Sequence, residues 1–220
     1  MYLSRVQVDR NNRQKTQDLT QLGAYHNWVE QSFPDEIASE RRLRHLWRLD
    51  RLGSREFLLV LSDEKPDLKK LSRYGVDGSA ATKDYEPLLN SVKEGQHLRF
   101  RLTANPTYTV MKDGDKRGKV YSHVTVTQQG EWLASHAEPA GFALEQVATD
   151  DGTVRDNFDV VGRDRPVMQH QYSRAVHLSR VSFEGVLVVK DLSLFKETLV
   201  KGIGREKAYG MGLLTIVPMR

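Results

Sequence analysis

The chain has 220 residues, of which 39% are hydrophobic and 28% charged, and its 33 Lys+Arg against 29 Asp+Glu give a net charge of +4. This composition is typical of one large or two small globular domains and excludes a disordered or fibrous chain. There is no cysteine, which excludes disulfides, thiolate catalysis and cysteine-ligated zinc. No apolar run reaches the roughly 18 residues that span a bilayer, and no signal-peptide pattern opens the chain, so we expect a cytoplasmic protein without a membrane partner.

The first half of the chain shows the pattern of strand, helix, strand, strand. Alternating side chains predict a strand at Tyr2–Val8. Apolar residues then recur at helical spacing from Leu22 to Phe33, before Pro34 ends the run. Two further strand-like segments flank a turn at Gly53 and predict a hairpin, namely His45–Leu49 and Glu56–Ser62.

The second half shows a similar pattern after a predicted linker at Tyr85–Gly95, whereas residues 63–84 have little periodicity. The strands expected here are His97–Leu102, Val120–Val126, Val181–Val189 and Leu213–Val217, and the helices are Glu131–His136 and Ser193–Lys201. The side chains of the last helix expected to face inward are Leu194, Phe195, Thr198 and Leu199.

Strands interleaved with a few helices in both halves predict an α+β fold of two tandem ferredoxin-like (RRM-like) domains. Each would be a sheet with helices on one face. We place the domains at residues 1–90 and 95–220. No close sequence repeat relates the two halves.

Four glycines lie between the last predicted helix and the last strand, in the sequence KGIGREKAYGMG: Gly202, Gly204, Gly210 and Gly212. Residues without Cβ let a backbone approach RNA and direct its N–H groups at phosphates, and Arg205 and Lys207 add positive charge to this segment. A tight helix-to-strand connection with incidental charge explains the local pattern equally well. The segment is therefore a candidate clamp for an RNA backbone.

Six features follow one another in a fixed order along most of the chain. They are MYLSRV at the start, His26, LWRL at Leu46–Leu49, LRFRLTANP at Leu98–Pro106, FEG at Phe183–Gly185 and GIGREKAYGMGLL at Gly202–Leu214. In order and approximate spacing the set resembles the CasE family of CRISPR repeat-processing endoribonucleases, subunits of type I-E Cascade complexes. The resemblance implies RNA lying across two ferredoxin-like domains, metal-independent cutting on the 3′ side of a repeat stem-loop, retention of the guide RNA and other Cascade subunits as partners.

Metal-free RNA cleavage uses the 2′-OH as nucleophile and needs a group that removes its proton. The sequence has no cysteine, no His-x-x-x-His pair and no obvious carboxylate cluster at metal-ligand spacing, so we expect no metal ion and no cofactor, although a site assembled from distant residues stays open. His26 is the candidate for proton transfer, because histidine titrates near neutrality and this one lies beside the apolar stripe. Most of the 7 histidines should have surface or structural roles, but the resemblance places the family's catalytic histidine at His26.

One position near His26 departs from the family's pattern. The resemblance implies an assisting tyrosine one helical turn before the histidine, where this chain has Gly23. Tyr25 is the nearest tyrosine and our tentative second catalytic residue. It lies about 200° around the helix from position 23, on the apolar stripe, so a role in the core is the more frequent explanation.

The positive charge that would stabilise the phosphorane is also not assigned. Some relatives carry a basic side chain soon after the histidine, whereas this chain has Asn27 and Gln31 in that stretch. Arg205 and Lys207 of the glycine-rich segment are the remaining candidates.

Two basic segments are candidates for binding the RNA stem. Residues 163–180 are predicted to form a hairpin that, by the resemblance, enters the groove of the stem, and its arginines are Arg163, Arg165, Arg174 and Arg180. A second patch is weakened by Asp113 and Asp115, and its cations are Lys112, Lys116, Arg117 and Lys119. A solvated charged loop is an equally frequent explanation for any one of these residues.

Three functions remain open on the sequence alone. The preferred one is an endoribonuclease that leaves a 2′,3′-cyclic phosphate. The second is a catalytically silent subunit that binds an RNA hairpin, which the glycine at position 23 favours. A DNA-binding module is the third and rests on charge alone.

Overall fold

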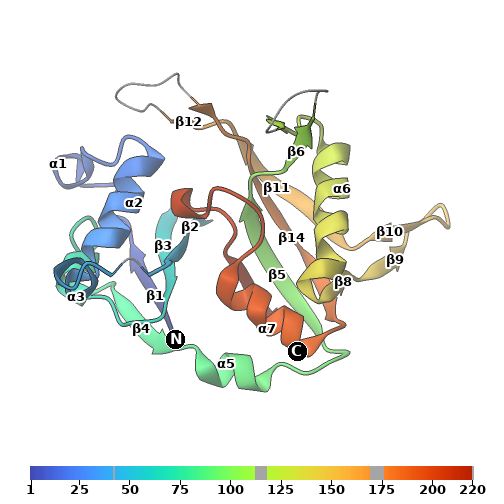
Figure 1. Ribbon diagram of the computed structural model, residues 1–220, viewed down its shortest axis with the longest axis horizontal. Coiled ribbons are helices and arrows are strands. Elements are labelled where there is room, and N and C mark those ends of the chain that lie inside the picture. The colour runs from blue at the N-terminus through green and yellow to red at the C-terminus, as the bar shows by residue number, and fades with distance from the viewer. Residues whose placement is uncertain (42, 112–117, 169–175, 220) are drawn as a thin grey trace. The chain divides into compact units, whose positions relative to one another are not determined.

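The computed structural model describes residues 1–41, 43–111, 118–168 and 176–219. The chain divides into two compact units (Figure 1). Unit 1 comprises Met1–Ser91 and Glu206–Leu213, and unit 2 comprises Val92–Arg205 and Leu214–Arg220. The segment Glu206–Leu213, which the sequence places in the second domain, thus lies with unit 1.

Unit 1 is built on a four-stranded antiparallel sheet with the order β2-β3-β1-β4. Its strands are β1 (Tyr2–Gln7), β2 (Leu46–Leu52), β3 (Arg55–Ser62) and β4 (Ala81–Asp84). Its helices are α1 (Arg13–Thr16), α2 (Leu22–Gln31), α3 (Pro34–Ala38), α4 (Leu68–Leu71), α5 (Glu86–Ser91) and the 3₁₀ helix η2 (Lys207–Tyr209). The sequence of elements and the strand order are those of a ferredoxin-like domain.

The core of unit 1 lies between its sheet and α2. Val6 of β1 and its register partner Leu58 of β3 are fully buried. On α2 the ring of Tyr25 stacks on Trp47 of β2 at 6.0 Å, and Trp28 is almost completely buried. Each such side chain contributes about 1.5–3 kcal/mol by burial. This packing fixes the rotation of α2 and hence the direction of its polar side.

Unit 2 contains the same arrangement with more insertions. Its strands are β5 (His97–Ala104), β6 (Thr107–Val110), β7 (Lys119–Ser122), β8 (Phe142–Leu144), β9 (Gln146–Ala148), β10 (Val154–Asp156), β11 (Phe158–Asp164), β12 (Val167–Met168), β13 (Val176–His177), β14 (Arg180–Val189) and β15 (Leu214–Pro218). Its helices are α6 (Val126–Ala137), the 3₁₀ helix η1 (Glu138–Ala140) and α7 (Leu192–Lys201).

The main sheet of unit 2 has the order β11-β14-β5-β15, and β8 pairs with the C-terminal part of β14. Helices α6 and α7 pack on one face of it, since Trp132 stacks on Phe183 of β14 and Phe195 meets Phe142 edge-on. With α6 after β5 and α7 after β14, this is again the ferredoxin-like connection. The predicted fold class, two tandem ferredoxin-like domains, is confirmed.

Several expected elements differ in their bounds from those observed. The predicted linker contains α5, and the strand expected at Val120–Val126 ends at Ser122. The following helix begins at Val126 because the side chain of Thr125 caps the amide of Gln128 in a capping box. Leu194 of α7 was expected to face inward but is 42% exposed, since it lies about 100° around the helix from the buried Phe195.

None of the helices in the described parts of the chain is long and apolar enough to cross a membrane.

Candidate active site in unit 1

His26 lies on the polar side of α2. Its neighbours Tyr25, Trp28 and Val29 form the buried stripe of the helix, whereas the side chain of His26 is 37% exposed. The ring is therefore fixed at its base by a packed helix and open to solvent at its edge. An accessible imidazole on a rigid element is suited to proton transfer.

A cavity of about 640 Å³ adjoins this histidine. It is lined by residues of α2, of α3 and of the chain that leads into β2, namely His26, Asn27, Glu30, Gln31, Glu36, Ile37, Glu40, Arg41 and His45. All of them belong to unit 1. Apart from Ile37 the lining is polar or charged, so the cavity can accept a polar ligand.

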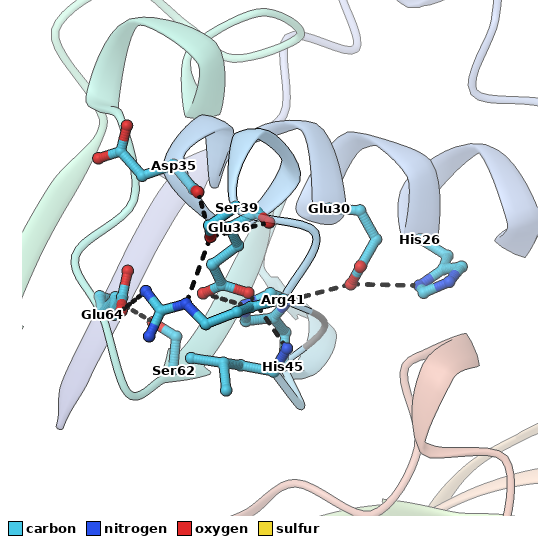
Figure 2. A network of polar contacts seen from close by, with 10 residues as sticks. His26, Glu30, Asp35, Glu36, Ser39, Arg41, His45, Ser62 and Glu64 are labelled. Atoms are coloured by element: carbon cyan, nitrogen blue, oxygen red, sulfur yellow. Dashed lines mark hydrogen bonds and ion pairs between the residues drawn. The ribbon is translucent and has the colours of Figure 1, made fainter.

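A chain of polar contacts connects His26 to the interior of unit 1 (Figure 2). Nδ1 of His26 lies 3.9 Å from Oε1 of Glu30, one helical turn further along α2. The same oxygen of Glu30 lies 3.0 Å from Nδ1 of His45. On its other side, Nε2 of His45 lies 3.2 Å from Oε1 of Glu36. Glu30 thus stands between two imidazole rings.

His45 is a buried histidine whose two ring nitrogens each face a carboxylate. Its side chain is 2% exposed, and the ring stacks on Phe33 at 3.9 Å. Burial lowers the pKa of His45, but hydrogen bonds to Glu30 and Glu36 outweigh it, and the pKa lies above its ordinary value of 6.5. A neutral imidazole has only one N–H, so only the imidazolium can donate to both carboxylates at once.

Tyr209 of η2 also contacts His26, with ring centroids 5.9 Å apart and an interplanar angle of 62°. The segment Glu206–Leu213 that carries it lies in contact with β2, the edge strand of the unit 1 sheet. The indole N–H of Trp47 donates to the carbonyl of Ala208 at 3.0 Å, and Arg48 donates to the carbonyl of Leu213 at 2.8 Å. These two bonds hold Tyr209 beside α2.

The buried Arg48 is itself balanced by Asp50, two residues along the same strand. Nε and Nη2 of Arg48 donate to the two carboxylate oxygens of Asp50 at 2.7 and 2.8 Å. The Arg48 side chain is 2% exposed. The ion pair therefore fixes the guanidinium that anchors Leu213.

The glycine-rich segment is divided between the two units. Gly202, Gly204 and Arg205 belong to unit 2, and Lys207, Gly210 and Gly212 belong to unit 1. All four glycines have positive φ angles, between 71° and 93°. At Gly210 the backbone also passes so close to Trp47 that a Cβ would lie 2.5 Å from the ring. Glycine is thus required at position 210 by the fold itself, which supports the structural interpretation there.

Lys207 is half-buried at the start of η2, near Arg44. Burial, and then the charge of Arg44, lower the pKa of Lys207. A cation that has lost part of its hydration interacts more strongly with an incoming anion. Arg205, the other candidate cation of this segment, is exposed in unit 2.

The structure places Tyr25 in the core. It is 4% exposed, lies between Trp28 and Trp47, and its hydroxyl contacts Arg10. These contacts favour the core role over the tentative catalytic one. Gly23 faces open space, with no atom within 4 Å of where a Cβ would stand, so a larger side chain would fit at that position.

Among the predicted stem-binding residues, Arg163 and Arg165 are exposed in unit 2. Arg163 donates to the carbonyl of Val124, and Arg180 forms a two-bond ion pair with Asp164. Arg163 and Arg180 therefore already have protein partners in this structure. The remaining three, Arg174, Lys116 and Arg117, lie outside the described residues.

Sequence reasoning did not identify four residues around His26, namely Glu30, Glu36, His45 and Tyr209. His45 was noted only as the first residue of a strand. The one available signal was the spacing of His26 and Glu30, which puts them on the same side of a helix. The described residues contain no group of three or more His, Asp or Glu side chains arranged to hold a metal ion.

Fold and site define a two-domain ferredoxin-like protein with an accessible histidine beside a polar cavity. The chain belongs to the family of CRISPR associated proteins, because the model of that family matches residues 1–218. This confirms the family predicted from the six ordered motifs.

Individual relatives support the assignment over the whole chain. The protein named CRISPR-associated endoribonuclease Cse3 of Thermus thermophilus is 29% identical over 222 residues, covering 99% of this chain and 100% of the relative. The Cascade subunit CasE of Escherichia coli K12 is 29% identical over 129 residues, 57% of this chain and 60% of the relative. A solved structure of CRISPR endoribonuclease Cse3 bound to a 19-nucleotide RNA matches with a TM-score of 0.79 at 26% identity, covering 99% of this chain and 100% of that one.

Proposed function

We propose that this chain is an endoribonuclease that binds the stem-loop of CRISPR repeat RNA and cleaves on its 3′ side without a metal ion. The observation that carries the proposal is His26, fixed on α2 and open to a polar cavity, in a chain whose full-length relative is named an endoribonuclease. The product is a 2′,3′-cyclic phosphate on one fragment and a 5′-hydroxyl on the other.

His26 acts as the general base of the reaction. It takes the proton of the 2′-OH, whose oxygen attacks the neighbouring phosphorus. The bond to the 5′ oxygen breaks as that oxygen takes a proton from water. The ring of Tyr209 supports the imidazole from the side. Lys207 is the cation we assign to the phosphorane, because it is half-buried and lies in unit 1 with the histidine.

RNA is held by groups outside this centre. The backbone N–H groups of the glycine-rich segment, with Arg205, bind phosphates, and Arg163 and Arg165 contact the stem. Arg180 would exchange its bond to Asp164 for one to RNA. The guide RNA stays bound after cleavage, and the chain acts as a subunit of a Cascade-type surveillance complex in the cytoplasm.

One substrate separates cleavage from silent binding. A repeat hairpin with a single 2′-deoxy sugar at the scissile nucleotide should bind as tightly as the all-RNA hairpin but remain uncut, while the all-RNA hairpin gives the cyclic phosphate. Tight binding of both hairpins with no product from either would identify the second candidate, a silent hairpin-binding subunit. That candidate is favoured by Gly23, which stands in place of the assisting tyrosine. Cutting of the deoxy substrate would exclude the 2′-OH as nucleophile.

A further inference from the structure

Glu30 occupies an unusual position for a helix surface carboxylate, because one of its oxygens faces two histidines (Figure 2). Its side chain is 33% exposed, whereas that of His45 is 2% exposed and that of Glu36 is 4% exposed. The exposed end of this chain of contacts is His26, and the buried end is Glu36. The buried end can therefore fix the position of the exposed end.

The contacts of His45 hold Glu30 in one orientation. Each ring nitrogen of His45 faces one carboxylate, so a protonated His45 donates to Glu30 and Glu36 at once. The oxygen Oε2 of Glu36 additionally accepts the amide of Leu43 at 3.3 Å. The oxygen Oε1 of Glu30 that contacts His45 also faces Nδ1 of His26.

We propose that Glu30 is a positioning residue for His26, held in place by the His45–Glu36 pair. Its carboxylate attracts the Nδ1–H of His26, which leaves Nε2 as the nitrogen that takes the 2′-OH proton, and it stabilises the imidazolium formed by that step. The inference rests on the proposed function of His26. At 3.9 Å the contact is longer than a hydrogen bond, and catalytic hydrogen bonds commonly tighten when substrate binds.

Other charged groups around the cavity do not replace Glu30 in this role. Arg41 pairs with Glu64 at 2.8 Å. Glu40 also lines the cavity, and it lies beyond the end of α3 in an exposed turn. Within the described part of the chain, His26 forms an ion pair with Glu30 and with no other residue.

The test compares Glu30→Gln with Glu36→Gln. Each change removes one negative charge from His45 while keeping an oxygen that can accept its N–H, but only the first removes the charge that faces His26. We expect Glu30→Gln to lower the single-turnover cleavage rate at saturating enzyme by about 10- to 100-fold, with the Kd for a 2′-deoxy repeat hairpin unchanged within about 2-fold. Glu36→Gln should lower the rate several times less.

A second readout reports the orientation directly. The ¹⁵N chemical shifts of neutral His26 should show the proton on Nδ1 in the wild type and a larger share on Nε2 in Glu30→Gln. Thermal unfolding of both variants measures the structural effect of weakening His45. If Glu30 has a purely structural role, the loss of cleavage rate should be in the same proportion to the loss of thermal stability in both variants. That outcome would overturn the proposal.

Failure of this inference is distinguishable from failure of the proposed function. If His26→Ala abolishes cleavage while Glu30→Gln cleaves at the wild-type rate with wild-type ¹⁵N shifts, the positioning role is wrong and the role of His26 stands. If His26→Ala cleaves normally, the proposed function of His26 is wrong, and the inference falls with it.

Discussion

The ring of Tyr209 meets the imidazole of His26 edge-on, at a centroid separation of 5.9 Å. Tyr209 reaches this position because the segment that carries it accepts hydrogen bonds from Trp47 and Arg48 on the edge strand β2. The contact joins the glycine-rich segment to the helix that bears the candidate base. An aromatic pair of this kind contributes about 0.5–1.5 kcal/mol beyond burial.

Removing the ring of Tyr209 should therefore slow cleavage. We expect Tyr209→Ala to lower the single-turnover rate by about 2- to 10-fold, the equivalent of that contact energy. Tyr209→Phe, which keeps the ring, should lose clearly less. The measurement is cleavage of a repeat hairpin by the two variants, and an equal loss in both would assign the effect to the hydroxyl instead of the ring.

The backbone at Gly210 should be intolerant of any side chain. Gly210→Ala introduces a Cβ 2.5 Å from the ring of Trp47 at a φ of 79°. Gly78→Ala is the matched control, since Gly78 has a φ of 72° and open space around it. We expect Gly210→Ala to lower the free energy of unfolding by about 1–3 kcal/mol more than the control, as overpacking does. Equal losses in urea unfolding would show that the close approach to Trp47 is absent.

The raised pKa of His45 should appear in the pH dependence of stability. A histidine whose pKa is higher in the folded state adds stability below its unfolded pKa and loses that contribution as pH rises through the folded value. The ordinary value is 6.5, so the stability difference between wild type and His45→Gln should be largest below it and shrink at higher pH. Urea unfolding across a pH series measures this difference, and a gap that widens with pH would contradict an ionised His45.

The ion pair of Arg48 and Asp50 should matter far more than exposed ion pairs. Asp50→Ala leaves a guanidinium that is 2% exposed without its carboxylate, for which we expect a loss of about 3–5 kcal/mol in the free energy of unfolding. Glu197→Ala removes an exposed pair with Lys201 and should cost about 0.5 kcal/mol or less. Similar losses in the two variants would mean that water reaches Arg48.

Local patterns in the sequence predicted much of the fold. Alternation identified β1, β5 and β14, and helical spacing identified α2 with Tyr25 on its buried side. The bounds of α6 were missed because Thr125 caps the helix earlier than its apolar residues suggest.

The site was only partly predictable, because its contacts join distant residues. The helix pattern singled out His26. His45, however, contacts Glu30 of α2 and Glu36 of α3, and the periodicity of a sequence does not encode contacts between separate elements. Tyr209 lies beside His26 because the carbonyl of Ala208 accepts a hydrogen bond from Trp47, 161 residues earlier in the chain. A single sequence gives no signal for contacts of that kind.

The most direct test of the central claim is cleavage of a repeat hairpin in EDTA by the wild type and by His26→Ala. We predict that the wild type cuts the hairpin in EDTA and leaves a 2′,3′-cyclic phosphate, and that His26→Ala binds the hairpin equally well but cuts at least about 100-fold more slowly. Wild-type cutting by His26→Ala, or loss of wild-type activity in EDTA, would contradict the account.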